Sequence, residues 1–382
     1  MDKTTYLASK PRYEILDGLR GVAAVLVVAY HLLETYFHGG PAQPLNHAYL
    51  AVDFFFVLSG FVIGYAYDDR WDRMTTWGFF RRRLVRLHPM VVFGTLVGAL
   101  MFYFGACDAF PTIGQTPWYM VLLVMVWGMT MIPVSTSFDI RGWAETNPLN
   151  GPAWSLQWEY LANILYALVV RRLSRLALGV CVALFAALTV VLCFNIDVTG
   201  FLAARSYAAY TVVGGWSLTP DQLQVGLTRL LYPFFCGLLL SRMNWTIRVR
   251  GGFWWCALLV VVILAMPWMG WGDARWTNGL YECICILIVF PLIVAIGAGS
   301  SVSGARSSAI NKFLGEISYP LYISHFPLIY VQMAWADSHQ DLPVQAHLFV
   351  AVSTFCLAIG MAYAALRLYD APLGKWLRKK LF

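Results

Sequence analysis

An arginine and a histidine on one predicted membrane span are the residues best placed for chemistry. Arg20 and His31 lie eleven residues apart in the apolar run 15–37. At about 100° per residue, eleven helical steps return to nearly the same face, with a rise of roughly 16 Å. One stripe of the helix then carries a cation near one membrane surface and an imidazole deep inside. Because ionisable side chains are costly at that depth, the pair indicates a functional site.

Carboxylates on the same and later spans are predicted partners of this imidazole. Asp53 lies near the outer start of the predicted span 49–67, at a depth that His31 can share, and Glu34 follows His31 by one helical turn. A carboxylate that orients an imidazole and stabilises its protonated form makes histidine an effective general base. Glu159, a turn inside a later span, is expected at the same level. The plainer alternative is that His31 only forms a hydrogen bond between helices.

Arginines cluster in the segment 68–88, which we expect to be a cytoplasmic loop. The positive-inside rule accounts for the run Arg81, Arg82 and Arg83. Arg83 and Arg86, however, are spaced about one helical turn apart, and guanidinium forks bind phosphate oxygens in pairs. A cytoplasmic ligand with several phosphates is therefore one interpretation. The chain has no glycine-rich phosphate loop ahead of a lysine, which argues against a nucleoside triphosphatase.

Composition places these residues in a polytopic membrane protein. Hydrophobic residues make up 59% of the 382 residues and charged residues only 12%, and apolar runs of about 20 residues recur along the chain. No gap between the runs is large enough for a separate soluble domain. The net charge of +7 is gathered in short basic loops rather than on a nucleic-acid-binding surface. The cysteines lie mostly in apolar runs without ligand spacing, so neither a disulfide framework nor a metal site is expected.

The basic residues decide which of eleven apolar segments cross the membrane. Ten are predicted to span it: residues 15–37, 49–67, 89–104, 156–170, 176–194, 223–240, 253–270, 279–297, 317–335 and 346–366. The eleventh, 118–134, is predicted to be re-entrant or to lie on the surface, because a crossing there would put Arg171, Arg172 and Arg175 outside. Both termini are then cytoplasmic.

The prediction is thus an all-α chain with one membrane domain, residues 15–370. This domain includes the cytoplasmic loop 68–88 and an outer and re-entrant region, 105–155. A cytoplasmic segment (1–14) precedes it and a basic cytoplasmic tail (371–382) follows it. Non-helical backbone at membrane depth must be surrounded by protein or water. We therefore expect Gly128, Pro133 and the loop to Trp154 to line a polar cavity.

Three further ionisable residues fall within predicted spans. Arg229 and Glu282 both lie in the outer parts of their spans, where a structural ion pair is the expected relation. His325 is followed closely by Pro327, and this proline loosens the helix and can open a cavity wall. A packing role is the alternative for His325.

Five motifs in order resemble the bacterial membrane acyltransferase family 3, from residue 13 to about residue 377. They are Leu16-Asp17-Gly18-Leu19-Arg20-Gly21 followed by His31, the stretch from Asp53 to Phe61, Arg83-x-x-Arg86, Trp154-Ser155-Leu156 with Glu159, and the stretch from Tyr322 to Pro327. Each motif alone is weak, whereas the ordered set is specific. Some relatives carry a fused extracytoplasmic hydrolase-like domain, which we expect to be absent here.

The resemblance implies an O-acyltransferase of the bacterial inner membrane that passes an acyl group, usually acetyl from acetyl-CoA, to a hydroxyl of a sugar or related acceptor. It implies that His31 and Arg20 are essential and that Asp53 and Glu159 support the site. The residues predicted to bind the donor are Arg20, Arg82, Arg83 and Arg86, and those predicted to bind the acceptor are Glu34, Ser59, Trp154, Trp158 and His325. No metal is expected.

In the expected mechanism, coenzyme A phosphates dock on the cytoplasmic arginines and the pantetheine chain passes Arg20. His31 then removes a proton from an acceptor hydroxyl that arrives from outside. An acyl-histidine intermediate is the alternative route. The rival class is a transporter or flippase that uses the buried charges as a pathway. Against it, no internal repeat relates the two halves of the chain, as is common in transporters.

Overall fold

The computed structural model describes Lys10 and residues 12–382, so most of the predicted segment 1–14 lies outside the described residues. Within that described part every regular element is helical, which confirms the all-α prediction. The α-helices are α1 (Glu14–Phe37), α2 (Ala51–Tyr67), α3 (Thr76–Leu100), α4 (Trp118–Met129), α5 (Trp154–Leu168), α6 (Arg175–Cys193), α7 (Pro220–Met243), α8 (Gly252–Ala265), α9 (Trp276–Ile284), α10 (Phe290–Gly299), α11 (Ala305–Ser324), α12 (Phe326–Ser338), α13 (Val344–Ala365) and α14 (Ala371–Leu381). Short π-helical turns, Cys285–Val289 and Leu366–Asp370, join α9 to α10 and α13 to α14.

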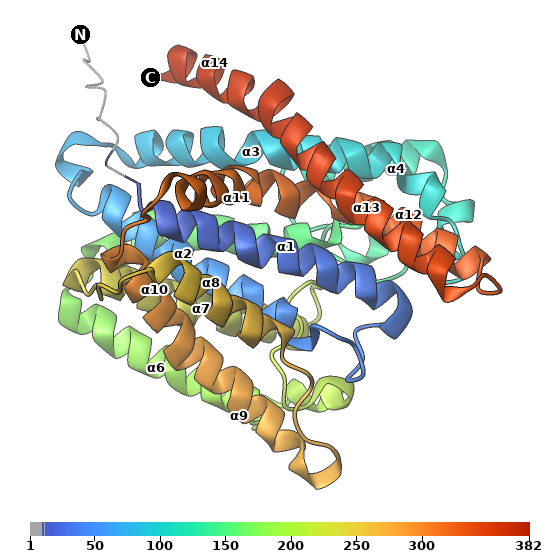
Figure 1. Cartoon of the computed structure of the whole chain (residues 1–382), viewed down its shortest axis with the longest axis horizontal. Coiled ribbons are helices and arrows are strands. Elements are labelled where there is room, and N and C mark those ends of the chain that lie inside the picture. The colour runs from blue at the N-terminus through green and yellow to red at the C-terminus, as the bar shows by residue number, and fades with distance from the viewer. Residues whose placement is uncertain (1–9, 11) are drawn as a thin grey trace.

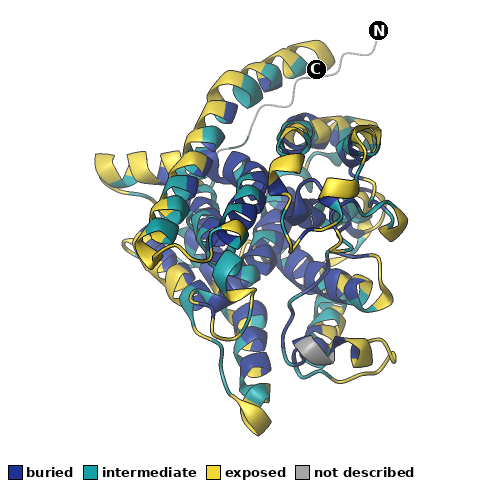
Figure 2. Ribbon diagram, turned by 90° about the vertical axis from the view of Figure 1, so that its right-hand side faces the viewer, coloured by how far each residue is buried: buried dark blue, intermediate teal, exposed yellow. Residues whose placement is uncertain are grey.

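Most of the helices run along one direction and form a bundle around α1 (Figure 1). α11 lies beside α1. α6 and α9 lie at one edge of the view, and α3 and α14 lie at the opposite edge. The start of α1 and the end of α14 are at the same end of the bundle. This agrees with an even number of crossings, while the number itself and the side of the membrane stay predictions. Buried residues gather along the middle of the bundle and exposed residues on its outer helices (Figure 2).

The centre of the bundle is held by helix pairs that approach closely through glycine. α2 packs along α7 and α1 along α11, the two most extensive pairings. A Cβ added to Gly60 would lie 2.0 Å from the carbonyl oxygen of Phe234, and one added to Gly237 would lie 2.0 Å from that of Val57. Such close backbone packing through small residues is typical of membrane helices. It brings polar side chains of α2 and α7 within reach of one another.

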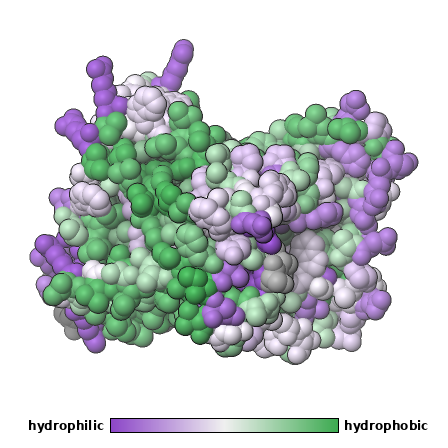
Figure 3. All heavy atoms as spheres, turned by 90° about the horizontal axis from the view of Figure 1, so that it is seen from below, coloured by the Kyte–Doolittle hydropathy of each residue, from purple (hydrophilic) through white to green (hydrophobic). Residues whose placement is uncertain are grey.

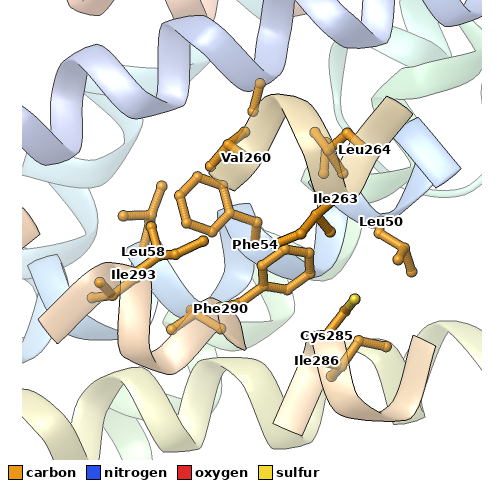
Figure 4. Packing of buried hydrophobic residues seen from close by; sticks show 14 of the residues in the cluster. Leu50, Phe54, Leu58, Val260, Ile263, Leu264, Cys285, Ile286, Phe290 and Ile293 are labelled. Carbon is orange, nitrogen blue, oxygen red and sulfur yellow. The ribbon is translucent and has the colours of Figure 1, made fainter. Parts of the chain in front are cut away.

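Aromatic and aliphatic side chains fill the space between α2, α8 and α10. The rings of Phe54 and Phe290 have centroids 5.5 Å apart, and Val260 and Ile263 of α8 close over them (Figure 4). All four side chains are buried. This layer is one side of the rigid frame from which α2 presents its polar face to the site.

The outer surface of the bundle suits a lipid bilayer. Among the described residues, seven helices or joined helices are long and apolar enough to cross a membrane. Figure 3 shows apolar surface over much of one face, with hydrophilic side chains gathered mostly toward the two ends. α4 has 12 residues, a rise of about 18 Å, which is too short to cross a hydrocarbon core of about 30 Å. The chain is therefore an integral multi-pass membrane protein with at least one apolar helix that does not cross alone.

Three expectations about segment boundaries are wrong. Residues 76–88, expected within a loop, form the first half of α3, because Thr75 caps that helix by accepting from the Gly78 N–H and arginine is a good helix former. The predicted span 317–335 is broken at His325 into α11 and α12, and Pro327 starts the second helix. The span predicted over 253–270 ends as a helix at Ala265.

Candidate active site

His31 and Glu34 form a hydrogen-bonded pair on one face of α1. Glu34 Oε2 accepts from His31 Nδ1 at 2.7 Å, and the two side chains retain 25% and 19% of their exposure. The imidazole stacks on His325 at 5.5 Å between centroids and meets the edge of Phe326 at 4.7 Å. Because the carboxylate holds Nδ1, the other ring nitrogen, Nε2, is the one left to exchange a proton.

Asp53 belongs to a different cluster, and its predicted contact with His31 is wrong. Both carboxylate oxygens accept from Arg229 of α7, the closest at 2.7 Å from Nη2. Arg229 also donates to the carbonyl oxygens of Tyr49 and Gly214. The close approach of α2 and α7 through glycine brings these two charges together. The position of Asp53 along its own helix does not show which helix it will face. Asp53 is fully buried and lines neither of the cavities described below.

The ion pair expected between Arg229 and Glu282 is also wrong. Glu282 instead accepts from the hydroxyl of Tyr49 at 2.5 Å, from the side-chain amide of Asn278 at 2.7 Å and from the Val212 N–H at 2.6 Å. Three donors satisfy the carboxylate without a cation at hydrogen-bonding distance. This cluster ties α9 to the outer start of α2.

Glu159 does not lie at the level of His31, because it lines a cavity with Arg20, nearer the start of α1. We call this side of the site inner and the side of His31 outer, after the predicted topology. Glu159 accepts from Arg83 Nη2 at 2.7 Å and from Ser59 Oγ at 3.0 Å. The depth estimate failed because the chain before α5 is already buried: the non-helical residues 145–150, the 3-10 helix Gly151–Ala153 and Trp154 are all enclosed by protein. α5 therefore starts deep in the bundle, and Glu159 lies deeper still.

An inner cavity of about 100 Å³ gathers the arginines. Arg20, Arg83 and Arg86 line it together with Glu159 and Tyr319. Arg83 is neutralised by Glu159, and Arg20 lies 3.6 Å from Asp17. Arg86 has an exposed side chain and, among the described residues, no carboxylate within ion-pair distance. The cavity thus keeps an excess of positive charge at its mouth.

Arg82, predicted to bind the donor, does not reach this cavity. Its guanidinium stacks over the ring of Phe382 in the C-terminal segment, 4.5 Å from the centroid. On a helix, neighbouring residues point about 100° apart. The side chain of Arg82 therefore leaves α3 on a different face from those of Arg83 and Arg86.

An outer cavity of about 380 Å³ opens on the other side of the site. It is lined by His31, Glu34, Tyr30, Trp143, Glu145, Trp154, Trp216 and Arg229, among others. The expectation that the loop before Trp154 lines a cavity is confirmed for this loop, whereas Gly128 and Pro133 line neither cavity. Trp154 lies on the wall as predicted.

The two cavities are neighbours, because Val52 and Tyr322 line both of them. The hydroxyl of Tyr322 lies 2.7 Å from Ser155 Oγ, and both side chains are buried. His31 on one side and the arginines on the other therefore lie in cavities that share two wall residues.

The remaining predicted residues have structural contacts. Trp158 donates to the carbonyl oxygen of Gly215 at 3.0 Å and packs on Gly226, outside both cavities. His325 is buried, donates from Nδ1 to the carbonyl oxygen of Leu321 at 3.0 Å, and has no partner for Nε2 among the described residues. Its ring acts as the surface on which His31 stacks.

Glu145 lines the site but escaped the sequence reasoning, because it lies in a polar loop that hydropathy places in solvent. Tyr322 begins one of the five motifs, but the sequence assigned it no role in the site. Among the described residues, no group of three or more His, Cys, Asp or Glu side chains is placed to hold a metal ion.

Comparison with known proteins identifies the class of this site. A family model described as an acyltransferase domain matches residues 13–366. The chain belongs to this acyltransferase family. It is 26% identical to the acyltransferase MdmB of Streptomyces mycarofaciens over 83% of this chain and 79% of that protein. It is 25% identical to the O-acetyltransferase OatA of Staphylococcus aureus over 96% of this chain and 58% of that protein.

A third relative, protein 2 in the picA locus of Rhizobium radiobacter, is 34% identical over 41% of this chain and 81% of that protein. No solved structure matches this chain. The protein is thus a membrane O-acyltransferase. Membership of this family also decides against the transporter alternative.

Proposed function

We propose that the protein transfers an acetyl group from cytoplasmic acetyl-CoA to a hydroxyl of a carbohydrate on the outer side of the bacterial inner membrane, with His31 as the general base. The observation that carries the proposal is that the His31–Glu34 pair lines an outer cavity that shares the wall residues Val52 and Tyr322 with the inner arginine cavity.

The inner cavity supports a coenzyme A donor. At about 100 Å³ it is smaller than the outer cavity, so only the pantetheine end of the donor, and not the nucleotide, is expected to enter it. The phosphates then stay at the mouth, where Arg86 is exposed. Arg20 lines the same cavity and belongs to the same helix as His31. Its guanidinium can attract the carbonyl oxygen of the thioester.

The transfer itself needs one base and one leaving thiolate. The acceptor oxygen attacks the thioester carbonyl as its proton moves to His31 Nε2, so that a C–O bond forms. The C–S bond then breaks, and the imidazolium returns the proton to the coenzyme A thiolate. Glu34 holds the ring in one tautomer and stabilises the imidazolium. In the alternative order, Nε2 attacks first and the acetyl group rests on His31 before the acceptor takes it.

Complementation of a deletion strain tests this proposal. Envelope glycans are compared by mass spectrometry after expression of the wild-type protein, His31→Ala or His38→Asn. His38→Asn is the matched control: His38 is the exposed residue after α1, and asparagine tolerates its left-handed backbone conformation. Ester-linked acetyl groups are expected with the wild type and the control and absent with His31→Ala. Unchanged glycans in the deletion strain would contradict a carbohydrate acceptor.

A further inference from the structure

A buried carboxylate in the outer cavity has no part in the steps above. Glu145 lies in the loop between α4 and α5, and its side chain is 7% exposed. Oε2 accepts from the hydroxyl of Tyr330 in α12 at 2.7 Å. Oε1 has no hydrogen-bond partner and Glu145 has no ion pair within the part of the chain that the structure describes. Arg141 attracts this carboxylate without forming an ion pair with it. A carboxylate kept this dry without a paired cation is costly, which indicates a use beyond packing.

The surrounding backbone is built to hold the carboxylate at the cavity wall. Asp139 accepts from the N–H groups of Arg141, Gly142 and Ala144 at 3.0, 3.0 and 2.6 Å, and this fixes the turn that leads to Glu145. Gly151 lies directly against the side chain: a Cβ there would be 2.4 Å from Glu145 Oε1. The carboxylate therefore occupies space that any other residue at position 151 would fill.

Aromatic surface flanks this carboxylate. Trp143, two residues earlier, lines the same cavity and is 39% exposed, with its ring packed 4.5 Å from that of Phe110. The indole is thus fixed on one side and available to the cavity. His31 and Glu34 line the same cavity, and Glu34 is near enough to act electrostatically on Glu145. A ring stacked on an indole with one hydroxyl on a carboxylate is a common way to bind a polyhydroxylated molecule.

We propose that Trp143 and Glu145 form the acceptor subsite, in which the indole stacks on a ring and Glu145 Oε1 accepts a hydrogen bond from the hydroxyl next to the one that is acylated. Glu145 is then a positioning residue that selects vicinal diols over isolated hydroxyls. This rests on the proposed function, and it adds a feature of the acceptor that the reaction alone does not require.

Two small probes separate the parts of this subsite. Cyclohexanol and cis-cyclohexane-1,2-diol share one ring, and only the diol carries a second hydroxyl for Glu145. Full-length purified protein is supplied with acetyl-CoA and either alcohol, and the acetylated product is measured. At about pH 8, above the pKa of about 7 to which burial raises Glu145, we expect the wild type to prefer the diol in kcat/KM by about 10-fold to 100-fold, as for a hydrogen bond to a charged group.

Substitutions then assign the preference to a residue. Glu145→Gln keeps an oxygen for Tyr330, and it should lower kcat/KM more for the diol than for cyclohexanol, so that the diol preference falls below about 5-fold because neutral hydrogen bonds are weaker. Trp143→Ala should lower kcat/KM for both alcohols by the same factor, since it removes only the stacking surface. Glu316→Gln, in a partly exposed ion pair with Arg367 that does not line the outer cavity, is the matched charge control and should keep the wild-type preference.

The outcomes separate this subsite from the proposed function. Equal use of the two alcohols by the wild type, or a diol preference that survives Glu145→Gln, would overturn the assignment of Glu145. Acetylation of an envelope glycan but of neither probe would overturn it as well. A preparation that releases no coenzyme A with any hydroxyl compound would contradict the proposed function itself. If Glu145 only anchors its loop, Glu145→Gln should change the two alcohol rates by one common factor.

Discussion

His31 is held by Glu34, one turn further along the same helix, with 2.7 Å between Nδ1 and Oε2. The base and its orienting carboxylate therefore come from α1 alone and need no second helix. Other helices supply the stacking surface of His325 and the arginines of the inner cavity.

Removing the orienting carboxylate should slow the chemistry without weakening donor binding. We expect Glu34→Gln to lower kcat by at least about 10-fold, within the 10² to 10⁴-fold range of general-base assistance, and to leave the KM for acetyl-CoA unchanged. The measurement is steady-state coenzyme A release in detergent. A raised KM with unchanged kcat would instead make Glu34 a binding residue.

Asp53→Asn should act mainly on stability. Asp53 and Arg229 are 0% and 1% exposed, and breaking a buried pair by removing one charge costs about 3–5 kcal/mol. The melting temperature in detergent should fall strongly. Adding Arg229→Gln to Asp53→Asn removes the cation that is left without a partner. The double variant should therefore have a higher melting temperature than Asp53→Asn alone. Normal stability with lost activity would return Asp53 to a direct catalytic role.

Arg86 should serve the donor. Arg86→Ala is expected to raise the KM for acetyl-CoA by about 10-fold to 100-fold, the value of a charge-assisted phosphate contact, while the KM for the acceptor stays constant. Arg82→Ala is the matched control, because that guanidinium stacks on Phe382 outside the cavity. Equal effects of the two substitutions would indicate a general electrostatic attraction of the donor and not a site.

Glu145 should make stability depend on pH. Burial raises the pKa of Glu145 from 4.5 to about 7, against smaller lowering effects of the Tyr330 hydrogen bond and Arg141, while Asp139 and Glu34 add negative charge that raises it further. The folded protein then binds a proton more tightly than the unfolded chain. Stability from this group is present below pH 4.5 and is lost as pH rises through about 7, by up to about 3 kcal/mol.

The comparison that isolates this effect uses Glu145→Gln, which carries no charge at any pH and keeps an acceptor for Tyr330. The variant should become more stable than the wild type as pH increases from 5 to 8, measured by thermal melting in one detergent. A constant difference across this range would show that Glu145 does not titrate there.

The sequence was informative where the signal is local and uninformative where it depends on how helices face one another. Helical spacing was enough to place Arg20, His31 and Glu34 on one helix, and the spacing of Arg83 and Arg86 put both on one wall. The partners of Asp53 and Glu159 could not be predicted. They depend on the rotation of α2 and α7 where Gly60 packs on Phe234 and Gly237 packs on Val57, and on the buried loop before α5.

The most direct test of the central claim places donor and acceptor on opposite sides of a membrane. Protein is reconstituted in vesicles with acetyl-CoA trapped inside and an envelope glycan added outside, and acetyl ester on the glycan is measured in intact vesicles. The account predicts acetylation by the wild type and none by His31→Ala. Acetylation only when both substrates share one side would contradict transfer through the two cavities.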